Sequence, residues 1–222
     1  MGKRFFRLGS PVVRLFLPRL TWRWDVPFDG EPCIFVCNHE RAMGPLQMAI
    51  NFPLREQSRI WIYDGPLHRE TFRAYVLQDH WWKEDGFLAP VLNVILPPVL
   101  GAIVPPVLRS VPHVPVYHEA KAMRTIRESL RILRDEGQHM VIFPEIPTAF
   151  GAHETEKINE GFLCLMPMYE HATGRPLRIW PMHMDLEKKE MHVKAPISFD
   201  MAQSLPDQVP RLTREVLDGI FT

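Results

Sequence analysis

The sequence predicts one α/β domain, and two observations indicate this fold class. Its 222 residues suffice for one domain of ordinary size with a single core, without disulfides or metals to stabilise it. Along the chain, short apolar runs typical of buried strands alternate with segments that have the periodicity of amphipathic helices. No repeat, linker or low-complexity tract divides the chain, so we expect a single domain over residues 1–222.

The first 24 residues are basic and apolar. They contain six Lys and Arg residues and no acid, interleaved with phenylalanine, leucine and valine. A helix of this composition either lies at an anionic membrane surface or packs on its own domain. We expect the first: a basic apolar N-terminal helix, residues 1–24, at the membrane interface. Arg14, Arg19 and Arg23 interrupt the apolar region, which argues against a signal peptide. Three cysteines are no disulfide framework, so we expect the cytoplasmic face of the membrane, in a peripheral or monotopic arrangement.

The first half of the chain predicts two strands and two helices in alternation. Residues 33–37 form an apolar run that ends at polar Asn38-His39, which is typical of a buried strand leading into a loop. A helix is expected over 44–52, a second strand over 58–63 and a second helix over 68–82, which ends near the Asp85-Gly86 break.

Residues 87–108 are almost wholly apolar and long enough for a membrane span. The pairs Pro97-Pro98 and Pro105-Pro106 remove backbone donors and predict two breaks. We therefore expect broken helices that lie in the membrane interface or line an acyl-chain groove; the alternative is an internal core segment.

The second half continues the alternation. Residues 113–117 predict a strand, and 119–136 a helix with Met123, Ile126, Leu130 and Leu133 on one face and Gly137 just beyond its end. Further strands are expected at 139–143, 177–182 and 190–194, and further helices at 156–171 and 206–220.

Composition and missing motifs exclude several classes of protein. Lys plus Arg equals Asp plus Glu, at 26 each, so no overall field predicts a nucleic-acid partner. The chain has no Gly-x-Ser-x-Gly elbow, no phosphate-binding glycine loop, no His-Glu-x-x-His and no Cys-x-x-Cys. A metal site from Cys33, Cys37 and His39 would lack a fourth ligand, so we expect no metal.

Two predicted strands each deliver a polar group at their carboxyl end. Val36-Cys37-Asn38-His39 ends the first, and Phe143-Pro144-Glu145 follows the other. Such strand ends are where α/β proteins place ligand groups. A histidine there is suited to act as a general base on a hydroxyl, because its unperturbed pKa lies close to cytoplasmic pH.

In the order of its features, the chain resembles the lysophospholipid acyltransferase superfamily, which includes glycerol-3-phosphate and 1-acylglycerol-3-phosphate acyltransferases. Members carry Asn-His, four residues and Asp-Pro, where this chain has Asn38-His39, four residues and Gly44-Pro45. The other blocks that match, in order along the chain, are Val114-Pro115-Val116-Tyr117-His118, Phe143-Pro144-Glu145-Ile146-Pro147-Thr148, Asn159-Glu160-Gly161 and Ile179-Trp180-Pro181-Met182.

The resemblance implies a mixed central sheet flanked by helices and an acyltransferase. His39 would take the proton of a lipid hydroxyl as that oxygen attacks the thioester of acyl-CoA or acyl carrier protein, which is a co-substrate, so no cofactor is implied. The membrane lipid surface is the implied partner. Gly44 stands where members have an aspartate that supports the histidine; Glu145 is the first candidate for a substitute acid, and Glu40, adjacent to His39 in sequence, is the second. The implied substrate-binding residues are Asn38, Glu40, His118, Thr148 and Gly161.

Loss of that aspartate leaves more than one function open. Neutralising the equivalent acid of a serine protease lowers turnover about 10⁴-fold, or roughly 5.5 kcal/mol of barrier. One hypothesis is an acyltransferase with a relocated acid. The second is a catalytically silent relative that binds lipid at the membrane, and the third a thioesterase that uses water as acceptor.

Overall fold

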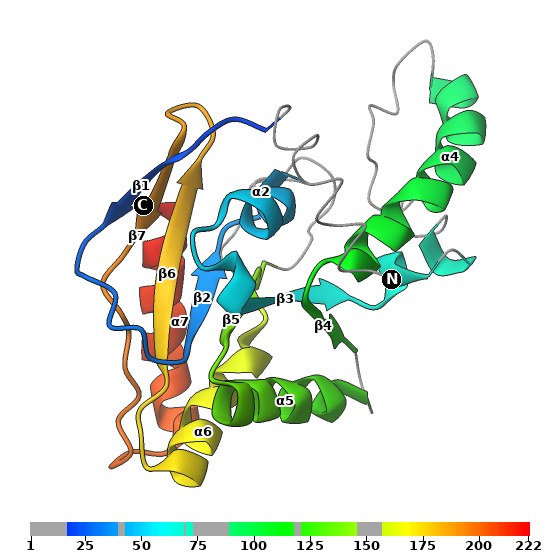
Figure 1. The fold of residues 1–222 in the computed structure, drawn as a ribbon. Helices are drawn as coiled ribbons and strands as arrows, with labels where there is room; N and C mark the ends of the chain where they lie inside the picture. Colours follow the sequence, from blue (N-terminus) through cyan, green and yellow to red (C-terminus); the bar gives the residue numbers. More distant parts are fainter. Residues whose placement is uncertain (1–16, 40–42, 69, 73–88, 118–120, 146–156) are drawn as a thin grey trace.

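The computed structural model describes residues 17–39, 43–68, 70–72, 89–117, 121–145 and 157–222 (Figure 1). Within them, seven strands form one sheet in the order β1-β7-β6-β2-β5-β3-β4. The strands are β1 (Thr21–Trp24), β2 (Cys33–Cys37), β3 (Ser58–Tyr63), β4 (His113–Val116), β5 (His139–Ile142), β6 (Arg178–Asp185) and β7 (Glu190–Val193).

The sheet is mixed. β6, β2, β5, β3 and β4 run parallel to one another, whereas β7 pairs antiparallel with β6 and parallel with β1. The expected α/β fold with a mixed sheet flanked by helices is confirmed. The parallel arrangement also means that the carboxyl ends of β2 and β5, adjacent strands, lie at the same edge of the sheet.

Side chains of the central strands alternate between two hydrophobic layers, because successive residues of a strand point to opposite faces. In β2, Ile34 and Val36 belong to one layer, and Cys33, Phe35 and Cys37 to the other. The first layer packs against α5 (Ala122–Arg131), η4 (Ile132–Glu136), η5 (Glu160–Cys164), α6 (Leu165–Thr173) and α7 (Leu205–Phe221). The second packs against α2 (Met43–Asn51) and the segment that precedes β2. Buried strands between two layers explain why β2 reads as a continuous apolar run.

Two short helical turns complete the described elements, η1 (Arg55–Gln57) before β3 and η2 (Gly65–Leu67) after it. The expected strand at 58–63 and the helix at 44–52 agree with β3 and α2 to within a residue. Of the helix expected over 68–82, most lies outside the described residues. On α5, Met123 was expected on the buried face but is 47% exposed, so only Ile126, Leu130 and Leu133 of that set face the core.

The N-terminal prediction needs a correction over residues 17–24; residues 1–16 lie outside the described part. Thr21–Trp24 form β1 at the edge of the sheet rather than part of a helix at a membrane interface. Trp22 packs against Phe52, with ring centroids 5.4 Å apart, and Arg23 points outward. This alternation has the period of two residues that a strand requires, and it packs the half-buried Trp22 and Trp24 against the protein's own core.

The apolar segment with two proline pairs also differs from the prediction. It forms one continuous helix, α4 (Ala89–Ser110), through Pro97-Pro98 and Pro105-Pro106, rather than helices broken at each pair. Each of these prolines lacks an N–H donor, yet neither pair ends the helix. In Figure 1, α4 extends beyond the sheet at one side of the molecule. Val94 and Ile95, in its first half, are 71% and 54% exposed.

Among the helices of the described residues, none combines the length and the apolar character that a bilayer-spanning segment requires.

Candidate active site

The candidate site lies where β2 and β5 end. Val36 of β2 is in register with Ile142 of β5, so the residues that follow each strand emerge side by side. His39 comes two residues after β2, and Glu145 three residues after β5. The fold therefore brings together the two residues that the sequence predicted as catalytic, 106 positions apart in the chain.

A hydrogen bond joins these two residues. The backbone N–H of His39 donates to Oε1 of Glu145 at 2.9 Å in a part-buried setting. A carboxylate that accepts a backbone N–H makes a charge-assisted bond, which is stronger than a neutral one. This bond runs through the main chain of His39, so Glu145 fixes the position of the loop that carries the imidazole.

Phe143 is a site residue that the sequence analysis did not single out. Its ring lies edge-on to the His39 ring, with centroids 5.3 Å apart and an interplanar angle of 68°. An aromatic edge contact of this kind restricts the orientation of the imidazole. The signal was present in the sequence, since Phe143 directly precedes Pro144-Glu145 and ends an apolar run.

Gly44 occupies the place where the resemblance leads one to expect an aspartate, and the backbone there leaves no room for a side chain. Its N–H donates to the carbonyl oxygen of His39 at 3.1 Å. A Cβ at Gly44 would lie 2.2 Å from that oxygen and 3.2 Å from Cε1 of Phe143. Any larger residue therefore requires the His39 turn to move. Gly44 is thus required by the close approach of two backbone segments.

Asn38, predicted to bind substrate, is buried and bonded to the neighbouring strand. Its Nδ2 donates to the carbonyl of Met184 at 2.9 Å, and its Oδ1 accepts the N–H of Met184 at 2.7 Å. The side chain thus continues the sheet hydrogen bonding beyond the end of β2 and holds the start of the His39 loop against β6. These two bonds give Asn38 a structural role. That Asn38 contacts substrate stays a prediction.

The segment before η5 returns to the site. Ile158 forms a bridge with Glu145, and the N–H of Asn159 donates to the carbonyl of Pro144 at 2.7 Å. Gly161 lies two positions further along the chain, and its N–H donates to Oδ1 of Asn159 at 3.0 Å. That Gly161 binds substrate stays a prediction. The other predicted substrate-binding residues, Glu40, His118 and Thr148, lie outside the described residues.

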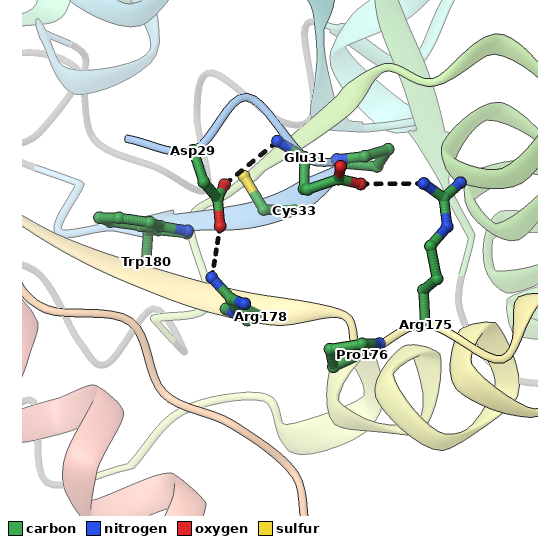
Figure 2. Close-up of a pocket in the computed structure, with 8 residues that line it drawn as sticks. Asp29, Glu31, Cys33, Arg175, Pro176, Arg178 and Trp180 are labelled. Atoms are coloured by element: carbon green, nitrogen blue, oxygen red, sulfur yellow. Dashed lines mark hydrogen bonds and ion pairs between the residues drawn. The ribbon is translucent and has the colours of Figure 1, made fainter. Parts of the chain in front are cut away.

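A small pocket lies at the opposite edge of the sheet, where β2 and β6 begin (Figure 2). Its volume is about 90 Å³, which is room for a few water molecules. Ion pairs cross its rim, between Asp29 and Arg178 and, at 3.0 Å, between Glu31 and Arg175. A volume this small does not suit a fatty acyl chain.

Behind this pocket, Cys33 and His139 form a buried neutral pair. Sγ of Cys33 lies 3.6 Å from Nδ1 of His139. Burial raises the pKa of the Cys33 thiol, and it lowers the pKa of His139 to about 4. Both groups are therefore uncharged at neutral pH, which is what an apolar environment requires. His139 belongs to the core and is separate from the candidate chemistry of His39.

No groups of three or more His, Cys, Asp or Glu suited to hold a metal ion occur among the described residues.

No family model matches the chain, and no curated protein matches it in sequence. Among solved structures, the chain is similar to the crystal structure of the 1-acyl-sn-glycerophosphate (LPA) acyltransferase PlsC from Thermotoga maritima. The sequence identity is 13% and the TM-score 0.45, over 98% of this chain and 77% of that chain. A likeness this distant does not place the chain in a family.

Proposed function

We propose that this protein is an acyltransferase that moves a fatty acyl group from acyl-CoA or acyl carrier protein to a hydroxyl of a lysophospholipid or a related lipid. The observation that carries the proposal is the pairing of His39 with Glu145 at the carboxyl ends of adjacent parallel strands, through a 2.9 Å hydrogen bond. The order of the motifs along the sequence supports it independently.

In the proposed reaction, the imidazole of His39 accepts the proton of the lipid hydroxyl. The oxygen attacks the thioester carbonyl, an ester bond forms, and the carbon–sulfur bond breaks. The departing thiolate receives the proton from the imidazolium. Glu145 holds the backbone at His39, and the Phe143 ring restricts the imidazole, so the protein's contribution is to position the base before the substrates arrive.

The direct test measures acyl transfer from radiolabelled acyl-CoA and acyl carrier protein to a panel of lysolipids. We expect His39→Ala to lower transfer by about 10²–10⁴-fold, the range that removal of a general base produces. His171→Ala is the matched control, because His171 is exposed on α6, away from the strand ends. Equal activity of His39→Ala and the intact protein would exclude His39 as the base.

The catalytically silent alternative is favoured by one observation. Gly44 cannot carry the missing acid, because its Cβ would lie 2.2 Å from the His39 carbonyl oxygen. Retained lipid binding without transfer to any acceptor would establish the silent form. Acyl-CoA hydrolysis without any lipid acceptor would instead support the thioesterase hypothesis.

We also propose that the protein works at a membrane surface, with α4 as a contact. Val94 and Ile95 expose apolar side chains on a helix that extends beyond the sheet (Figure 1). Apolar groups of this kind gain free energy when they enter the boundary between headgroups and acyl chains. The proposal places the open side of α4 against lipid.

Flotation with vesicles that contain anionic lipid tests this contact. We expect the intact chain to float, and Val94→Asp/Ile95→Asp to remain largely in the dense fraction, because burying two carboxylates in the interface is costly. Met201→Asp serves as the control, since Met201 is 47% exposed but lies outside α4. Failure of the intact chain to float would contradict the proposal.

A further inference from the structure

The exposed side of the helical segment 121–136, which comprises α5, the Lys121 before it and η4 after it, divides into two halves that differ in charge pairing. In the second half, Arg131 bonds Glu128 and Glu136, each at 2.8 Å, and Arg134 bonds Asp135 at 2.6 Å. In the first half, Lys121, Arg124 and Arg127 are all exposed, and none has an acidic partner among the described residues. The chain as a whole has a net charge of zero, so this run of cations is a local feature.

The three cations form a continuous ridge. Residues three apart on a helix are surface neighbours, and Lys121, Arg124 and Arg127 follow this spacing. The opposite side of α5 is anchored, since Thr125, Ile126 and Ser129 are buried. The ridge, defined as these three residues, therefore faces away from the core, and no ion pair with the described residues neutralises its charges.

The ridge begins at the same sheet edge as the candidate active site. Oγ1 of Thr125 accepts the N–H of Tyr117 at 3.1 Å and donates to the carbonyl of Pro115 at 2.8 Å, which fixes the first turn of α5 to the end of β4. β4 is parallel to β3, β5 and β2 and stands three strand positions from β2. At strand spacings of about 4.8 Å, this offset is roughly 14 Å along the edge.

We infer that the ridge docks an acidic carrier protein that presents the acyl thioester on a flexible arm. This inference rests on the proposed function and selects between its two acyl donors. Unpaired cations on one surface attract and orient a partner with an acidic surface. A flexible arm is needed because the ridge lies some strands away from His39, and a docked protein does not itself reach that residue.

A lipid surface is the competing occupant, and two observations count against it. Met123, at 47% exposure, is the single large apolar side chain that the described part of α5 exposes, so the ridge offers little apolar surface to a bilayer. The exposed residues Val94 and Ile95 lie on α4. In Figure 1, α4 extends above the end of the sheet that β3 and β4 form, whereas α5 lies below it. A planar membrane that receives the first half of α4 would therefore leave the ridge available to a protein.

Calorimetry at low and high salt tests the inference. It measures how tightly the full chain binds a purified acidic acyl carrier protein that bears a palmitoyl thioester. The ridge variant, Arg124→Gln/Arg127→Gln, removes two ridge cations. The control variant, Arg131→Gln/Arg134→Gln, makes the same chemical change at two arginines of the same helical segment that form ion pairs with acidic residues. We expect the ridge variant to raise Kd about 10-fold at low salt, and the control variant to change it less than about 2-fold. High salt should weaken binding of the intact chain and reduce this difference.

Transfer from palmitoyl-CoA, measured alongside, should be the same in both variants and the intact chain. Equal loss of carrier-protein binding in the two variants would overturn the inference, and so would a selective loss of palmitoyl-CoA transfer in the ridge variant. Loss of binding to anionic vesicles, with carrier-protein binding unchanged, would assign the ridge to lipid and also overturn it. Carrier-protein binding that depends on the ridge, in a protein that transfers no acyl group, would uphold the docking surface and refute the proposed catalysis.

Discussion

The carboxyl and amino ends of the central parallel strands differ in which polar groups they hold and in how those groups are paired. At the carboxyl end, His39 and Glu145 are joined by a hydrogen bond and flanked by the Phe143 ring. At the amino end, a pocket of about 90 Å³ is crossed by ion pairs and backed by the neutral Cys33–His139 pair (Figure 2). One end positions a titratable group beside strand termini, whereas the other neutralises the groups it contains.

The contrast between the two ends shows that the cavity and the candidate chemical site are separate features of this protein. The pocket brings together arginines and carboxylates, but they already satisfy one another. The carboxyl end carries the proposed proton-transfer group, because parallel strands deliver the residues that follow them to one edge. We expect substitutions at the carboxyl end to change activity, and substitutions at the amino end to change stability alone.

After the loss expected for His39→Ala, the largest expected effect of such a substitution is at Glu145. Glu145→Ala removes the acceptor of the His39 N–H and should lower acyl transfer about 100-fold, since a hydrogen bond to a charged group contributes roughly 1.5–3 kcal/mol. Glu145→Gln keeps an oxygen acceptor and should recover much of the rate. Steady-state kinetics of both variants measure this.

Glu31→Ala is the control from the amino end, where Glu31 pairs with Arg175 at the pocket rim. Its rate should stay within about 2-fold of the intact protein, because an exposed ion pair contributes little. A loss of rate as large as that of Glu145→Ala would remove the functional distinction between the two ends.

Next in size is the effect of restoring an acid at Gly44. Gly44→Asp should lower the free energy of unfolding by roughly 1–3 kcal/mol, the usual cost of overpacking, without raising activity, because its Cβ meets the His39 carbonyl oxygen. Urea unfolding and transfer assays together measure the outcome. Gly101→Ala is the matched control: its Cβ would lie 3.4 Å from Phe72, an ordinary contact, and alanine favours the helix. Increased transfer in Gly44→Asp would show that the turn opens and that an acid there is useful.

The smallest effect is the pH dependence that His139 confers. Its pKa falls from 6.5 to about 4 on folding because of burial, so the unfolded chain binds the proton more readily between these values. Stability is therefore full above pH 6.5 and declines as the pH falls toward 4. Between pH 7 and pH 5.5 we expect a loss of about 1 kcal/mol from this residue.

Urea unfolding at the two pH values measures this loss. His139→Leu should remove that part of the dependence, and the exposed His171→Ala should leave it unchanged. An identical pH dependence in His139→Leu and the intact chain would show that His139 is not the group responsible.

Several elements followed from local sequence alone. Cys33–Cys37 and Ser58–Tyr63 were predicted at their observed bounds, because short apolar runs with polar ends have few other solutions. Gly137, with φ of 62°, ends the helical segment after α5 as expected of a glycine in the left-handed region. The choice of His39 and Glu145 as a pair also came from their places at predicted strand ends.

Other features required tertiary information. β1 was missed because its four residues lie within a basic apolar segment whose local composition also suits a helix. The proline pairs of α4 predicted breaks that the structure does not have. Met123 follows the helical period of the buried face, yet it is 47% exposed.

The sequence by itself determined the α/β class, the strands that end at His39 and Glu145, and the absence of an acid at position 44. Only the tertiary structure decided that β2 and β5 are neighbours, that Glu145 binds the backbone rather than simply facing the loop, and that position 44 has no room for a side chain. The physical reason is range: strand and helix signals arise from neighbouring residues, whereas a contact across 106 positions and a 2.2 Å approach depend on how the strands pack.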